Sequence, residues 1–210
     1  MAYRFTATSS QYLSAGASVT AGSPVTIAYW VRPTDILFGN LMHVSVGDSG
    51  STHRIQMYRA SGVNFTIDSV ATSSAGFFVA SAFSSGVWAH CACTFASNTS
   101  RTPYINGSAS SINTTNIGAQ NAFNETLIAA RRNITVGLFG NDTIAEVGIW
   151  NAALTAAEVA SLAKGMTPDK IRPQSLVFYA PLVRDLIDQK GGLTITNTNS
   201  TVANHPRVYA

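Results

Sequence analysis

The sequence predicts an all-β fold, a two-sheet antiparallel sandwich with one short helix near residues 155–164. Apolar runs suited to strands recur at intervals of roughly 8–12 residues along the chain. Gly, Ser, Asn and Asp, which favour turns, separate these runs. One segment alone carries helix signals, and it follows directly after a long strand-like run. Many short strands with a single helix are typical of a sandwich.

The clearest early strand covers residues 25–31, and Pro33 closes it because proline cannot donate to a ladder. Asn106 and Gly107 form a strong tight-turn signal after a short strand. The other expected strands cover residues 41–46, 53–58, 63–67, 76–82, 87–95, 103–105, 127–130, 134–138, 175–180 and 193–196.

The run over residues 142–150 predicts the strand that leads into the helix. Side chains alternate between the two faces of a regular strand. We therefore expect Ile144 and Glu146 to point to one face, and Val147 and Ile149 to the other.

The helix signals follow this strand. Thr155 and Glu158 have the spacing of a capping box, in which each side chain satisfies a backbone N–H at the helix start. Val159 and Leu162 then give the helix an apolar stripe, and Gly165 ends it.

Composition excludes two function classes. Only 11% of the residues are charged and the net charge is +3, with scattered Lys and Arg residues, so we expect no nucleic-acid partner. No apolar run approaches the roughly 18–20 residues of a membrane span, so we expect no membrane insertion. The first six residues lack the apolar core of a secretory signal, which predicts a chain that is not exported by the general route.

The cysteines and tryptophans have structural interpretations. Cys91 and Cys93 lie two apart in an expected strand and share a face, which is poor geometry for a disulfide, so we expect two small buried hydrophobes. We expect Trp30, Trp88 and Trp150 to pack in the core or at a sheet edge.

Three segments carry a family likeness. Residues 25–33 resemble the strand near the start of laminin-G-like jelly rolls. Residues 88–95, followed by 103–107, resemble the Trp-x-His-x-Ala and Tyr-x-Asn-Gly hairpin of that family. Residues 144–159 resemble its closing strand and helix. Over residues 3–165 the chain is therefore similar to the laminin-G-like branch of the concanavalin A-like lectin/glucanase superfamily, which implies a concanavalin A-like jelly roll.

This resemblance bears on domain organisation. At 210 residues the chain is long enough for one sizeable core. We expect a single laminin-G-like domain over residues 1–210, with residues 166–210 as a C-terminal extension packed on the sandwich or closing it. That extension resembles a segment found in bacteriophage and environmental members of the family.

Catalysis is not expected. The superfamily includes glycosidases, whose retaining mechanism needs two carboxylates about 5–5.5 Å apart. On this fold the resemblance implies a Glu-x-Asp-x-x-Glu motif on one strand. Glu125, Glu146 and Glu158 are the only glutamates, and none has an aspartate two residues later. We therefore expect no enzyme.

The family likeness also implies candidate binding residues. A calcium ion takes about 6–8 oxygen ligands, and Asp48, Asn141 and Asp142 are the best-placed suppliers, although all three are also ordinary turn residues. We expect no other cofactor. Loop or edge aromatics can form a platform for a sugar, and the candidate carbohydrate-binding residues are Phe38, Tyr58, Phe77 and Phe78.

Two functions stay open. The first is a non-enzymatic virion structural protein of a bacteriophage: a capsid decoration, head fibre or tail-associated adhesion module. Its expected partners are a capsid shell or tail protein, further copies of the same chain in a homo-oligomer, and a surface polysaccharide. The alternative is a free extracellular carbohydrate-binding lectin, with or without a requirement for calcium.

Overall fold

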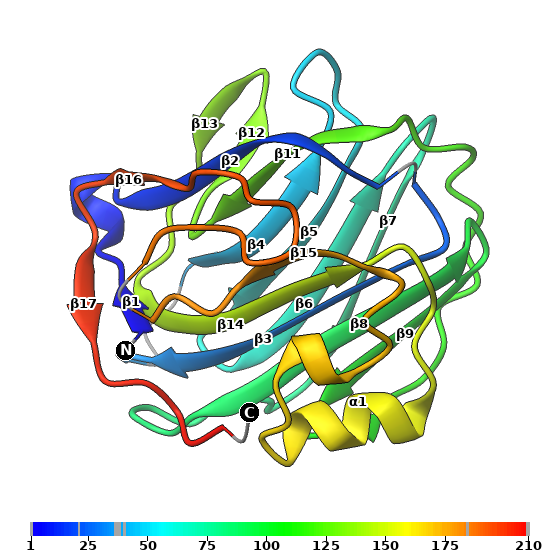
Figure 1. The fold of residues 1–210 in the computed structure, drawn as a ribbon. Helices are drawn as coiled ribbons and strands as arrows, with labels where there is room; N and C mark the ends of the chain where they lie inside the picture. The colour runs from blue at the N-terminus through cyan, green and yellow to red at the C-terminus, as the bar shows by residue number, and fades with distance from the viewer. Residues whose placement is uncertain (1, 21, 36–38, 40, 184, 209–210) are drawn as a thin grey trace.

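The structure is a computed structural model, which describes residues 2–20, 22–35, 39, 41–183 and 185–208. It is a sandwich of two antiparallel sheets with one α-helix, α1 (Ala156–Ala163), on the outside (Figure 1). Short 3-10 turns lie at Ala7–Ser9 and Pro168–Lys170. The strands are β1 (Ala2–Arg4), β2 (Tyr12–Thr20), β3 (Val25–Pro33), β4 (Leu41–Gly47), β5 (Arg54–Ala60), β6 (Asn64–Val70), β7 (Ser74–Val79), β8 (Ala89–Ser97), β9 (Ser100–Ile105), β10 (Ser108–Ala109), β11 (Phe123–Ile128), β12 (Arg131–Asn133), β13 (Thr135–Gly137), β14 (Asp142–Trp150), β15 (Leu176–Ala180), β16 (Thr196–Thr198) and β17 (Thr201–Ala203).

The chain crosses repeatedly between the two sheets. An eight-stranded sheet has the order β10-β9-β8-β3-β14-β1-β17, with β15 also paired to β14. A seven-stranded sheet has the order β16-β2-β11-β4-β5-β6-β7, and β12 and β13 form a separate hairpin. The segment after α1 adds β15 and β17 to the first sheet and β16 to the second, so it pairs with both layers.

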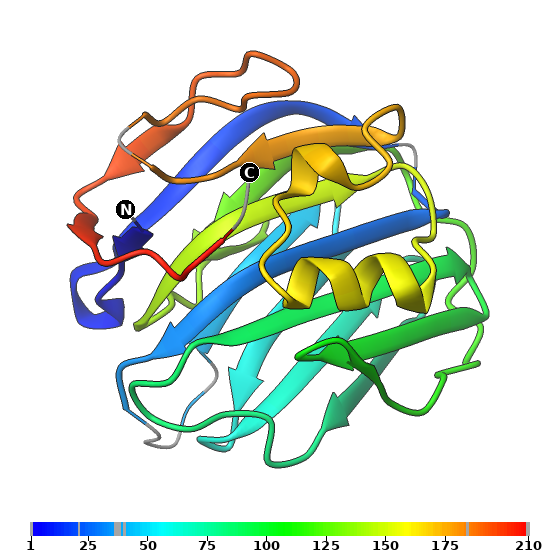
Figure 2. The ribbon, with the colours of Figure 1, turned by 60° about the horizontal axis from the view of Figure 1, so that its bottom comes forward.

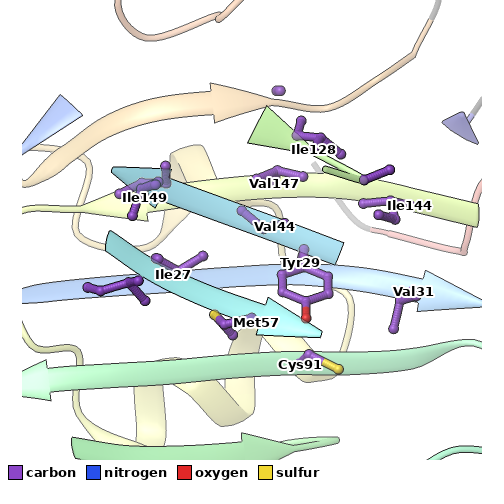
Figure 3. Close-up of a cluster of buried hydrophobic side chains, with 14 of the residues drawn as sticks. Ile27, Tyr29, Val31, Val44, Met57, Cys91, Ile128, Ile144, Val147 and Ile149 are labelled. Atoms are coloured by element: carbon purple, nitrogen blue, oxygen red, sulfur yellow. The ribbon is translucent and has the colours of Figure 1, made fainter. Parts of the chain in front are cut away.

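The main core lies between the sheets. Ile27, Tyr29 and Val31 of β3 share it with Val44 of β4 and Met57 of β5, and all five are fully buried (Figure 3). The residues between them on each strand point outward, as the two-residue period of a strand requires. The alternation seen in the sequence therefore places one face of each sheet in a shared interior.

Helix α1 lies on the outer face of the eight-stranded sheet (Figure 2). A second apolar cluster lies between the helix and that face. Val159 and Leu162 of the helix pack there with the fully buried ring of Trp150, whose indole N–H donates to the carbonyl of Ile171 at 2.8 Å. The only helix in the described part of the chain is far too short to cross a membrane.

The predicted helix cap is confirmed. The Glu158 N–H donates to the Thr155 hydroxyl at 3.3 Å, and the Thr155 N–H donates to the Glu158 carboxylate at 2.7 Å. Gly165 follows the helix with a φ of 100°, which a residue without a Cβ adopts most easily.

In the strand over residues 142–150, the prediction of which side chains share a face of the sheet is wrong after Ile144. Glu146 has a φ of 53° and sits in a bulge where the pairing with β3 shifts register. A bulge adds one residue to a strand and so reverses the alternation beyond it. Ile144, Val147 and Ile149 all face the core, while Glu146 lies on the outer side and accepts a hydrogen bond from the Tyr179 hydroxyl at 2.6 Å.

Other strand predictions met mixed outcomes. Residues 134–138 form no single strand, because Ile134 has a φ of 72° and turns the chain between β12 and β13. The long strand β2 was not expected.

Cys91 and Cys93 are confirmed as buried free thiols. Trp30 is half-buried on the outer side of the eight-stranded sheet, and the half-buried Trp88 lies under the guanidinium of Arg32.

Candidate functional site

Strand β5 turns polar side chains outward from the seven-stranded sheet. Arg54, Gln56 and Tyr58 alternate with Ile55 and Met57, which are fully buried in the core. The neighbouring strands β4, β6 and β7 follow the same pattern. We call the resulting outward surface the polar face, and its residues are Ser45, Arg54, Gln56, Tyr58, Thr66, Asp68, Gly76 and Phe78.

Two aromatic rings share one row of the polar face. Tyr58 pairs with Thr66, and Thr66 pairs with Phe78 on the edge strand β7. Two strand spacings separate the aromatic positions by about 9.6 Å. Phe78 is 63% exposed, and burial raises the pKa of the half-buried Tyr58 hydroxyl. A threonine between two rings gives a platform with a polar centre.

The next row is held by hydrogen bonds. Arg54 Nε donates to Gln56 Oε1 at 3.2 Å, and Gln56 Nε2 donates to Asp68 Oδ2 at 2.7 Å. Burial raises the pKa of Asp68, while the Arg54 charge and the Gln56 hydrogen bond oppose that rise. The three groups are thus fixed in place before any ligand arrives.

Glycine keeps this row open. Gly76 pairs with Asp68 in the ladder. A Cβ built at Gly76 would lie 4.0 Å from Asp68 Oδ1, so even a small side chain there would be in van der Waals contact with this oxygen. With no side chain at this position, Asp68 Oδ1 can accept a hydrogen bond from a bound hydroxyl group.

The β12–β13 hairpin borders the polar face. Asn133 accepts a hydrogen bond from Arg54 Nη1 at 3.3 Å, and Arg132 forms a two-pronged ion pair with Glu125 at 2.5 and 2.6 Å. A small hollow beside this pair has room for about one water molecule. The hairpin therefore limits the open part of the face to the strands from β5 to β7.

A second polar group is enclosed between the sheets, and we call it the buried cluster. Arg59 donates to both oxygens of Asp142 at 3.1 Å, and His43 Nε2 lies 2.9 Å from Asp142 Oδ2. The Tyr29 hydroxyl lies 3.0 Å from His43 Nδ1. All four side chains are fully buried.

Charge balance explains the ionisation of this cluster. Burial alone would raise the pKa of Asp142, but the hydrogen bonds and charges of His43 and Arg59 outweigh it and lower the pKa. Burial has the largest effect on the pKa of His43 and lowers it, although the hydrogen bond and charge of Asp142 oppose that change. No substrate reaches these groups, and their role is to hold β3, β4, β5 and β14 together.

The predicted calcium ligands do not form one site. Asp142, the first residue of β14, contacts His43 near the start of β4. Asp48 instead follows the last residue of β4. Asn141 Nδ2 donates to Asp35 Oδ2 at 3.2 Å. An arginine already contacts both oxygens of Asp142, which disfavours a cation there. Across the described ranges, no group of three or more His, Cys, Asp and Glu side chains is suited to a metal ion.

Asp48 accepts hydrogen bonds from its own loop and from the segment that leads into β11. Asn121 Nδ2 donates to Asp48 Oδ2 at 2.9 Å, and Asn124 Nδ2 and the Gly50 N–H donate to Oδ1 at 3.1 and 3.0 Å. These hydrogen bonds, the one from Asn121 above all, lower the pKa of Asp48. These three donors would have to be displaced or shared before calcium could bind, so these residues do not fit the ion well.

Only some of the predicted sugar-binding aromatic residues lie on the polar face. Tyr58 and Phe78 lie on the polar face, as a sugar platform requires. Phe77 points inward and packs against the core, because it alternates with Phe78 on β7. Phe38 lies outside the described residues. Gln56 and Asp68 were missed, although their alternation with buried neighbours was visible in the sequence.

Comparisons with known proteins agree on the fold. A family model described as the concanavalin A-like lectin/glucanases superfamily matches residues 6–160. No curated protein sequence matches this chain.

Solved structures show the same architecture. A candidate carbohydrate binding protein from Bacteroides ovatus has a TM-score of 0.71 at 16% identity, over 95% of this chain and 58% of the other. The CBM40 of the Ruminococcus gnavus IT-sialidase, bound to α2,3-sialyllactose, has a TM-score of 0.56 at 13% identity, over 70% and 91%. A SAP-like pentraxin from Limulus polyphemus gives 0.58 at 17%, over 73% and 75%. At these identities the likeness shows the fold alone.

Proposed function

The chain belongs to the concanavalin A-like lectin/glucanase superfamily, and from this premise we propose that it is a non-catalytic carbohydrate-binding module. The polar face is its binding surface. The single observation that carries the proposal is the arrangement on β5 to β7, where two aromatic rings stand beside a fixed carboxamide and carboxylate. A few oriented polar groups among apolar surface are what ligand sites in proteins usually contain.

Each part of the polar face has a role in this proposal. The rings of Tyr58 and Phe78 pack against the apolar faces of sugar rings, and Thr66 lies between them. Asp68 accepts a hydrogen bond from a sugar hydroxyl. Arg54 and Gln56 hold that carboxylate in position, so little conformational freedom is lost on binding.

The absence of catalysis is supported by the partners of the glutamates. Glu125 is paired with Arg132. Glu158 caps α1 and pairs with Arg172 at 2.6 Å. Glu146 is buried and contacts Tyr179 and His205, the latter at 2.9 Å. All three carboxylates therefore serve the fold, and a polysaccharide-release assay is expected to detect no product.

Binding to a glycan array tests the proposal. We expect the wild-type protein to bind one or more neutral oligosaccharides. Asp68→Asn should lose that binding and Tyr58→Ala should weaken it, and both variants should remain folded. Tyr12→Ala, which removes a half-buried tyrosine of β2, is the matched control and should bind normally, because β11 and β4 separate β2 from β5 in the sheet. Retained binding in both polar-face variants would contradict the proposal.

A virion structural role stays a prediction that rests on the sequence: the low fraction of charged residues, the first residues without a secretory signal, and the C-terminal resemblance. An array without any bound glycan, together with a capsid shell protein in the complex purified from the source, would favour that role over carbohydrate binding.

A further inference from the structure

Two arginines flank a pocket on the outer face of the eight-stranded sheet, at the opposite end of β3 from α1. Arg4 of β1 and Arg32 of β3 each pair with Thr143 of β14, so the three side chains form one row. The pocket has a volume of ≈ 180 Å³. Its lining residues are Arg4, Arg32, Pro33, Thr34, Gly86 and Thr143.

Neither guanidinium has an acidic partner among the residues that the structure describes. The two strands that carry Arg4 and Arg32 stand about 9.6 Å apart, with β14 between them. Like charges at this separation repel, and an anion between them would remove that repulsion. Elsewhere in the molecule Arg59, Arg132 and Arg172 each pair with a carboxylate.

An aromatic ring supports one side of the pocket. The Arg32 guanidinium lies over the ring of Trp88, with Cζ 5.5 Å from the ring centroid. A cation over an aromatic face is held without using its N–H groups. Arg32 is therefore oriented in advance, and its donors remain available for a ligand.

We propose that this pocket binds the carboxylate of an acidic sugar residue. A planar carboxylate matches the paired N–H donors of a guanidinium. The volume lies below the roughly 300–1,000 Å³ of pockets for drug-sized ligands, so it suits a single sugar unit. The pocket lies on the other sheet from the polar face, so this inference is independent of the function proposed above.

A matched pair of ligands tests the assignment by NMR titration. Methyl β-D-glucuronide carries a carboxylate where methyl β-D-glucoside carries a hydroxymethyl group. We expect the glucuronide alone to shift the backbone amides around residues 4, 32 and 143. Its Kd should rise at least tenfold in Arg4→Gln and in Arg32→Gln. Lys164→Gln, which removes an exposed charge beside α1, is the control and should leave the Kd unchanged.

Three results would overturn the proposal. The first is equal binding of the glucoside and the glucuronide, and the second is no amide shift with either. The third is a sulfate titration that shifts the same amides with the same Kd, since this would identify a site for inorganic oxyanions. Amide spectra of the variants verify their folding. Tyr58→Ala should leave glucuronide binding intact, so failure of one site is distinguishable from failure of the other.

Discussion

The buried cluster and the polar face use almost the same chemical groups for opposite purposes. Each combines an arginine, an aspartate, a tyrosine and a planar nitrogen-bearing side chain, and both draw residues from β5. In the buried cluster the groups satisfy one another, and all of them are enclosed. On the polar face Gly76 leaves one side of Asp68 uncovered. The direction in which a strand residue points thus decides whether such groups stabilise the fold or bind a ligand.

The largest expected effect is in the buried cluster. Asp142→Asn leaves the buried Arg59 charge with only the partly exposed carboxylate of Asp35, at 3.3 Å, as its counter-ion. It should lower the free energy of unfolding by about 3–5 kcal/mol. Asp68→Asn, on the open face, should change it by about 1 kcal/mol or less. Urea denaturation of both variants measures the difference. Equal destabilisation by the two substitutions would remove the distinction between the two regions.

Acid should act on the enclosed groups. Burial lowers the pKa of His90 to about 3, and it also lowers the pKa of His43. An unfolded chain, with histidine pKa values of about 6.5, binds more protons below that pH, so stability falls as the pH falls. For His90 the slope approaches about 1.4 kcal/mol per pH unit below pH 6.5 and persists to about pH 3.

His90→Leu checks the origin of this slope by urea denaturation at several pH values between 6.5 and 4. His90 Nδ1 has no hydrogen-bond partner, so the substitution breaks no hydrogen bond of that nitrogen. We expect a shallower decline with falling pH in the variant. A slope identical to that of the wild type would show that His90 does not cause it.

A smaller effect is expected on the polar face. Tyr58→Ala and Phe78→Ala each remove one ring of the platform, which is worth about 0.5–1.5 kcal/mol and corresponds to a Kd increase of up to about tenfold. Isothermal titration calorimetry with an array-selected oligosaccharide measures it. Phe77→Leu, on the inward side of the same strand, should change the stability but not the Kd.

Calcium should have the smallest effect. Because Asp48 and Asp142 are engaged by donors from the protein, millimolar calcium or a chelator should leave the Tm and the glycan Kd unchanged. A metal that binds the folded state alone must raise the Tm with concentration. A concentration-dependent rise measured by differential scanning calorimetry would restore the calcium hypothesis.

Local sequence signals predicted the parts of the fold that depend on neighbouring residues. The capping box of Thr155 and Glu158 and the two-sheet class were both predictable, because periodicity and caps act over a few residues. The bulge at Glu146 was not, since its positive φ depends on the strands packed around it. Strand β2 was missed because its small and polar residues carry little apolar periodicity.

The candidate site was predictable only in part. Tyr58 and Phe78 could be proposed as exposed aromatics, but their common row depends on how β5, β6 and β7 pair. The row of Arg4 and Arg32 joins residues far apart in the chain through Thr143, and no local pattern reports such a pairing. Strand register therefore determines which residues form each candidate site, and it cannot be predicted from local sequence patterns.

The most direct test of the polar face is an amide shift map with an array-selected neutral oligosaccharide. We predict that the largest shifts fall in β5, β6 and β7, within residues 54–58, 64–70 and 74–79, and that Gly76→Val, which covers Asp68, abolishes them. Shifts confined to loops at the ends of the sandwich, or unchanged binding by Gly76→Val, would contradict the account.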